Sequence, residues 1–177
     1  MRRLGIITAL SMLVLAVSAS VALATGTPVF NAAAAPSGTH VQTGAPSCAF
    51  GPGALDVTCS SYELSGVGNT NATASLTAKY SATVDCRNNG GNVVATKTGT
   101  FTAGPVTAQL SPKNGRLTVP SLTVSAPTAQ QFLAQQTCPN PNWTPEIRTP
   151  PGITFVSSVY TLSFAGFNGA FITITDP

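Results

Sequence analysis

Four cysteines carry the clearest chemistry in this chain. They are Cys48, Cys59, Cys86 and Cys138, and no two of them form the C-x-x-C pair that is typical of zinc sites and redox enzymes. An even number of cysteines in a small exported protein is typical of disulfides, and four cysteines allow three pairings. We favour Cys86–Cys138, which would join distant parts of the chain, with Cys48–Cys59 holding down the N-terminal extension.

Side chains for catalysis or metal binding are scarce. A Ser-His-Asp or Cys-His site needs a histidine on the folded scaffold, and the single histidine, His40, lies in a segment expected to be flexible. A pair of carboxylates across a cleft can hydrolyse glycosides. The acidic residues are Asp56, Glu63, Asp85, Glu146 and Asp176. We expect these acids to lie apart on the surface, and we predict no enzyme, no cofactor and no metal site.

Residues 138–152 form the one candidate binding loop. Its proline residues stiffen the backbone, and a stiff loop loses little conformational entropy on binding. The candidate binding residues are Pro139, Asn140, Pro141, Asn142, Trp143 and Pro145. Tryptophan is a favoured anchor on sugar rings and in protein pockets. The alternative is that Trp143 caps one end of a hydrophobic core.

The elements that would hold these residues are β-strands. Apolar and polar residues alternate without exception from position 72 to position 86. Successive side chains of a strand point to opposite faces, so this pattern predicts one long strand with a buried face and a solvent-facing one. A sheet that buries one side is typical of antiparallel all-β proteins.

Shorter alternating runs predict the other strands. Asn and Gly residues between positions 87 and 92 predict a hairpin turn. Further strands are expected at 55–59, 62–64, 93–103, 106–110, 117–119, 122–126, 153–165 and 170–175, with one helical turn at 129–136. This arrangement predicts a two-sheet antiparallel β-sandwich of immunoglobulin-like type, with a closed barrel as the second architecture. The buried strand tryptophan of antibody domains is missing, because Trp143 lies in a loop.

The first 24 residues are predicted to be an export signal. Arg2 and Arg3 precede an apolar run at 4–17, and Ala22-Leu23-Ala24 forms an A-x-A cleavage site. An uncleaved membrane anchor is the alternative, because the apolar stretch continues to Ala24. We expect an extracellular protein that is either free or held at the cell surface.

The rest of the chain divides into a leader and one domain. Residues 25–47 lack periodicity and are predicted to be a flexible leader, which leaves 48–177 as the β-sandwich domain. Only 7% of the residues are charged, and the net charge is +3. The basic residues are scattered rather than clustered, which excludes the electrostatic footprint of a nucleic-acid-binding protein.

Three short motifs follow one another along the chain. They are a GxGN turn at 66–69, a C-x-N-x-G-G-N hairpin at 86–92 and a C-P-N-x-x-W loop at 138–143. In this order they resemble a group of uncharacterised small secreted β-sandwich proteins of high-GC Gram-positive bacteria. Members of that group tend to carry a cysteine near the end of the last strand, and its absence here supports pairing of Cys59 with Cys48. The resemblance implies export and a β-sandwich, and it implies no activity.

These observations predict a secreted or cell-envelope protein that is not an enzyme and acts by binding or as a structural component. The expected partner is an extracellular protein or polysaccharide, with no nucleic acid, and membrane contact only through the export signal. One alternative is an inhibitor of an exported hydrolase that presents the 138–152 loop. Another is a pore-forming toxin whose strands at 72–86 and 93–103 insert as an amphipathic hairpin.

Overall fold

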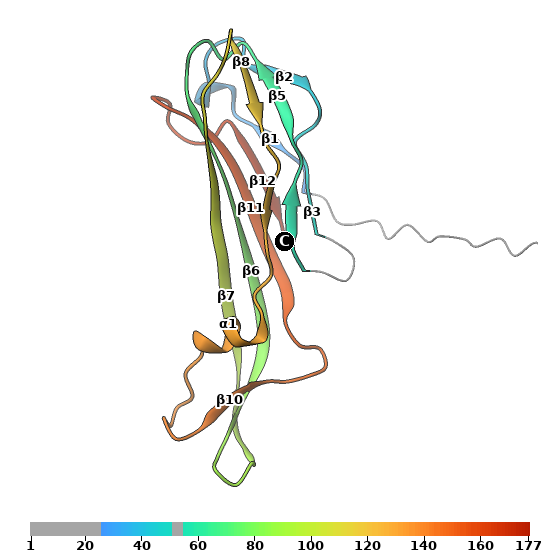
Figure 1. Cartoon of the computed structure of the whole chain (residues 1–177), viewed down its shortest axis with the longest axis vertical. Coiled ribbons are helices and arrows are strands. Elements are labelled where there is room, and N and C mark those ends of the chain that lie inside the picture. The colour runs from blue at the N-terminus through green and yellow to red at the C-terminus, as the bar shows by residue number, and fades with distance from the viewer. Residues whose placement is uncertain (1–25, 51–54) are drawn as a thin grey trace, which may run out of the picture.

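The computed structural model describes residues 26–50 and 55–177. The export signal predicted at residues 1–24 lies outside the described residues. The described chain folds into antiparallel sheets with very little helix, so the predicted all-β sandwich is confirmed. Figure 1 shows an elongated molecule in which the longest strands run along the long axis.

One layer is a six-stranded sheet built around a long central strand. Its strands are β1 (Val29–Phe30), β6 (Ala72–Arg87), β7 (Val93–Leu110), β10 (Thr144–Ile147), β11 (Thr154–Phe164) and β12 (Ile172–Asp176). β6 pairs with β7 on one side, and on its other side it pairs with β11 and, further along, with β10. β7 runs continuously through Gly104 and Pro105, where two separate strands were expected, because a bulge against β6 absorbs the irregularity.

The second layer is divided into two three-stranded sheets, where the sequence predicts one. One sheet contains β2 (His40–Thr43), β5 (Tyr62–Ser65) and β8 (Arg116–Val119), and the other contains β3 (Cys48–Phe50), β4 (Val57–Cys59) and β9 (Leu122–Val124). The division falls at residues 60–61 and 120–121, and Pro120 has no N–H group to continue a ladder. Val119 and Leu122 are both buried, so the inward positions change from odd to even numbers across Pro120, between the strands predicted at 117–119 and 122–126.

The hydrophobic core lies between the two layers. All the apolar residues at even positions from 72 to 86 are buried, which confirms the long strand and its inward face. The facing layer and the neighbouring strands contribute fully buried side chains such as Leu64, Leu117, Leu162 and Ile172. Half of the inward residues of β6 are alanines, whose small side chains let the second layer pack close to the sheet.

The prediction of a flexible leader at 25–47 is wrong for its described part. β1 pairs with β12 and β2 pairs with β5, and the short helix η1 (Ala32–Ala34) lies between them. Ala34 and Ala35 are buried. These short strands are held by backbone hydrogen bonds to strands distant in sequence, so they leave no alternating pattern of their own. The folded domain therefore begins well before residue 48.

The hairpin of β6 and β7 continues past the second layer to one end of the molecule (Figure 1). We call this region, residues 84–95 and 129–148, the distal end. It contains α1 (Ala129–Ala134), which confirms the helical turn predicted at 129–136 and begins with a capping box between Thr128 and Gln131. Phe132 of α1 is fully buried, and its ring centre lies 6.2 Å from that of Phe101 on β7. The helix is thereby fixed against the hairpin.

Candidate binding site at the distal end

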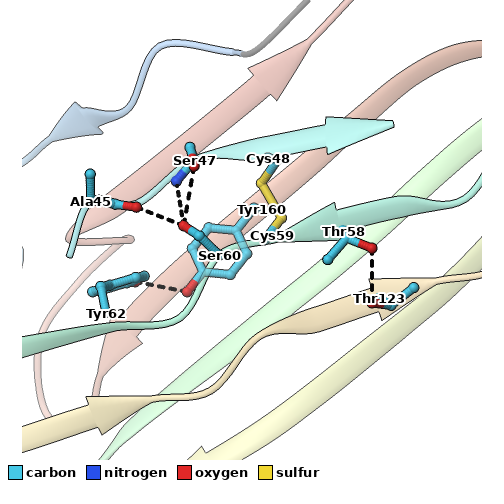
Figure 2. The surroundings of a disulfide bond; sticks show 9 residues. All are labelled: Ala45, Ser47, Cys48, Thr58, Cys59, Ser60, Tyr62, Thr123 and Tyr160. Carbon is cyan, nitrogen blue, oxygen red and sulfur yellow. Dashed lines mark hydrogen bonds between the residues drawn. A yellow bond between two sulfur atoms is a disulfide. The ribbon is translucent and has the colours of Figure 1, made fainter. Parts of the chain in front are cut away.

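Both favoured disulfides are confirmed. Cys86 and Cys138 are bonded with their Cα atoms 5.8 Å apart, and Cys48 is bonded to Cys59 with a Cα separation of 4.0 Å. Figure 2 shows the second bond joining β3 to β4, where the two cysteines are also partners in the strand pairing. Disulfides persist in oxidising surroundings, so two of them indicate an oxidising compartment outside the cytosol.

The Cys86–Cys138 disulfide fixes the start of the candidate loop. Cys86 lies on the inward face of β6 near its end, and it is almost fully buried. Cys138 follows α1 and comes immediately before Pro139. The disulfide therefore ties the loop to the central strand of the large sheet.

The sequence predicts a loop over the whole of residues 138–152, but part of this segment is a strand. Residues 144–147 form β10, which pairs with the end of β6, and Pro145 lies opposite Cys86. β11 leaves this part of β6 free, because its pairing with β6 starts at Thr154 and Ser81. Proline has no N–H group for a strand ladder, but it is accepted at a sheet edge such as this one.

A buried carboxylate supports the far side of the loop. The Arg148 guanidinium donates to both oxygens of Asp85, at 3.0 Å from Nε and 2.7 Å from Nη2, and Thr96 Oγ1 donates to the same carboxylate at 2.8 Å. The hydrogen bonds from Arg148 hold the pKa of the Asp85 carboxyl below its usual value, with a further contribution from Thr96. Asp85 is only 6% exposed, so the expectation of an isolated surface acid is wrong.

A second ion pair lies beside the first. Arg87 at the end of β6 pairs with Glu146 of β10, and it also donates to the Gly91 carbonyl oxygen at 2.8 Å. Glu146 likewise departs from the isolated position expected of it. Together the two ion pairs, the strand pairing and the disulfide cross-link β10 and the preceding loop to β6.

The tip of the loop, residues 139–143, is a compact turn. The Asn142 backbone N–H donates to the Asn140 side-chain oxygen at 2.9 Å, and the Trp143 N–H donates to the Asn140 carbonyl at 3.0 Å. Of the six candidate residues, Pro139, Pro141 and Asn142 are exposed, whereas Asn140, Trp143 and Pro145 are half-buried.

Trp143 stands apart from the core of the described structure. It belongs neither to the buried core residues nor to the half-buried apolar side chains packed against them. The aromatic pairs of the described chain involve phenylalanines and Tyr80, and none includes Trp143. Part of its indole surface therefore faces solvent on a rigid support.

The remaining sequence candidates do not gather into a site. His40 is exposed on β2, with Nδ1 2.8 Å from the Gly38 carbonyl oxygen, rather than in a leader. No group of three or more histidine, cysteine or acidic side chains that could hold a metal ion occurs within residues 26–50 and 55–177. The helices of that same part of the chain include none long and apolar enough to cross a membrane.

The cluster of Asp85, Thr96 and Arg148 is the feature that sequence reasoning missed. Its three residues come from β6, β7 and the segment after β10, and only the register of β10 on β6 brings Arg148 to Asp85. Comparison with known protein families, curated proteins and solved structures finds no match for this chain. What the distal end can do must therefore be argued from its geometry.

Proposed function

We propose that this protein is exported and acts, without catalysis, by binding a partner outside the cell through its distal end. The observation that carries the proposal is Trp143, a large aromatic side chain outside the core on a turn that is cross-linked to the central strand. Two disulfides and the predicted signal at 1–24 support the export part of the proposal.

Rigidity makes this turn suitable for binding. A mobile loop must lose conformational freedom when it binds, at about 0.5–1.5 kcal/mol for each side chain immobilised. Here the disulfide, the pairing of β10 and the two ion pairs have already fixed the backbone. A half-buried tryptophan can then contribute its contact surface to a partner at little further entropic cost.

The test is to replace Trp143 by alanine and to measure binding and stability together. The probes are insoluble cellulose, chitin and bacterial cell walls, and the proteins of culture supernatants. An aromatic anchor of this kind typically contributes 2 kcal/mol or more, so we expect Trp143→Ala to weaken binding about thirtyfold. Phe167→Ala is the matched control, because Phe167 is an exposed aromatic residue outside the distal end. It should leave binding unchanged.

The two interpretations of Trp143 predict opposite results. If the indole is a binding anchor, Trp143→Ala keeps the melting temperature of the parent. If the indole caps the core, the variant loses several kcal/mol of unfolding free energy, as core truncations do, and the proposal is wrong.

The same variant also separates the alternative functions. Inhibition of an exported hydrolase that disappears with Trp143→Ala would make the partner an enzyme. Leakage of liposomes caused by the wild-type protein would favour a pore-forming role instead, although the apolar side chains of β6 are already buried in the core.

A further inference from the structure

The outward face of the large sheet is covered with hydroxyl groups. Every outward residue of β6 from position 73 to position 83 is serine or threonine, with the exception of Lys79. On β7, threonine occupies every second position from 96 to 102, and all of these threonines are exposed. We call this surface the hydroxyl face.

The strand register arranges these side chains in rows across the sheet. Ser75 of β6 lies between Thr107 of β7 and Thr161 of β11, and Ser81 lies between Thr100 and Thr154. Neighbouring strands are about 4.8 Å apart, and side chains on one face of a strand are about 6.7 Å apart. A hydroxyl group can both donate and accept hydrogen bonds. Ser81 and Thr154 already bond to each other at 3.1 Å, and the rows as a whole form a grid of donors and acceptors.

The grid has a hollow near its middle. Two register shifts fall at neighbouring levels of β6, one against β7 between Leu76 and Ala78 and one against β11 between Phe155 and Ser157. A bulge locally bends a strand and re-aims its side chains. The hollow here measures about 210 Å³, and its lining includes Thr77, Lys79, Thr102, Ser157 and Val159.

Lys79 gives the hollow a single positive charge. Among the charged side chains that residues 26–50 and 55–177 place on the hydroxyl face, Lys79 alone has no ion-pair partner. The other charges on this face lie at the distal end, where Arg87 pairs with Glu146 and Arg148 pairs with Asp85. The face therefore combines many neutral hydroxyl groups with one unpaired cation.

We infer that the hydroxyl face binds an acidic polysaccharide, with a uronate carboxylate on Lys79 and sugar hydroxyl groups along the rows. A partner for such a grid must itself offer both donors and acceptors at short intervals, as a chain of sugars does. A single ammonium group favours a partner with widely spaced negative charges. Densely charged polyanions such as nucleic acids would need a basic patch, which this face lacks.

The test uses hyaluronan oligosaccharides, in which a uronate alternates with a neutral sugar, and the same oligosaccharides after reduction of their carboxyl groups. The oligosaccharide is titrated into the protein, and NMR spectra recorded at each step give both the affinity and the residues whose signals shift. We expect hyaluronan to shift signals around Lys79, with an affinity that falls as salt is added. We expect the reduced oligosaccharides to bind about tenfold more weakly, because a charge-assisted hydrogen bond is lost.

Matched variants test the roles of the ammonium and hydroxyl groups separately. Lys79→Gln should weaken hyaluronan binding about tenfold and should not weaken binding of the reduced form, whereas Lys113→Gln removes an exposed charge outside the face and should change neither. Thr102→Val keeps the side-chain shape but removes a hydroxyl from the hollow, and it should weaken binding of both forms. Its control is Thr118→Val on β8.

The inference would be overturned by equal binding of native and reduced oligosaccharides, by an equal loss of affinity in both lysine variants, or by no binding of hyaluronan at all. Loss of hyaluronan binding in Trp143→Ala with full binding in Lys79→Gln would also overturn it, since the sugar would then bind at the distal end. Lys79 lies in the middle of β6 and Trp143 lies in the turn at the distal end, so this inference and the proposed function can fail independently.

Discussion

Tyr62 and Tyr160 place two hydroxyl groups in the interior, where the layers meet. Their oxygens are 2.7 Å apart, and the side chains come from β5 of the second layer and β11 of the large sheet (Figure 2). Both residues are at least 96% buried, so each hydroxyl depends on the other for a partner that water cannot supply. This hydrogen bond joins the two layers at a defined position.

Removing both of these hydroxyl groups should cost less than the sum of the two single removals. Tyr160→Phe leaves the Tyr62 hydroxyl buried without its partner, and we expect the unfolding free energy to fall by about 1–3 kcal/mol. The double variant Tyr62→Phe/Tyr160→Phe removes both polar groups and should lose less than the sum of the single variants. Urea unfolding of the four proteins measures this coupling, and strictly additive losses would show that the two hydroxyl groups act independently.

The tyrosines also predict the behaviour of the protein at high pH. The chain has three tyrosines, Tyr62, Tyr80 and Tyr160. The pKa of each is raised above the ordinary value of 10.0, mainly because the side chain is buried. A group whose pKa is raised by folding contributes stability that is complete below pH 10 and lost as the pH rises further. We expect phenolate absorbance to appear only together with unfolding. Ordinary titration near pH 10 in a folded protein would contradict this.

At the scale of elements, the two disulfides should differ in what they contribute. Cys86–Cys138 spans 52 positions of sequence and Cys48–Cys59 spans 11, so the first restricts the unfolded chain more strongly. Loop-closure entropy gives about 4 kcal/mol for the longer span and about 3 kcal/mol for the shorter. Replacing each pair by serine and measuring urea unfolding tests this order. Loss of Cys86–Cys138 should also increase amide exchange in β10, and a larger loss from the Cys48–Cys59 variant would contradict the prediction.

The strands that the sequence predicts are those that carry their own pattern. β6 alternates over its full length, and the hairpin after it has Asn and Gly at the turn, so both were predicted from local residues. β1, β2 and β10 are short and lie beside strands distant in sequence, and β3 has only three residues beside the neighbouring β4, so their residues show no alternation of sufficient length. Backbone pairing over long sequence separations leaves little trace in side-chain type.

The same reasoning separates what was predictable in the candidate site from what was not. Cysteine number and position favoured the correct disulfides, and proline and tryptophan marked the segment around Trp143. The Asp85–Arg148 ion pair depends on the register of β10 on β6, and no local sequence pattern predicts that register. The outward position of Asp85 predicts an exposed carboxylate, yet neighbouring side chains cover it.

For the whole molecule, the main prediction concerns the mature chain. We expect the secreted protein to begin at or near Thr25, because the predicted cleavage site ends at Ala24. We also expect no free thiol, since all four cysteines are bonded. Intact-mass measurement with and without alkylation checks both points. A mass that includes residues 1–24, or alkylation without reductant, would contradict them.

The order of strands in the large sheet also affects when the protein can fold. β6 pairs with β7 on one side, but its other side pairs with β11, and β1 pairs with β12, so these two pairings need residues from the C-terminal part of the chain. A chain that emerges from its N-terminus cannot complete this sheet until β12 is available. Closing such long loops before any contact is gained makes folding slow. The large sheet would therefore stay incomplete until β12 is available, and if the protein is exported as we propose, such a delay would suit passage across a membrane in the unfolded state.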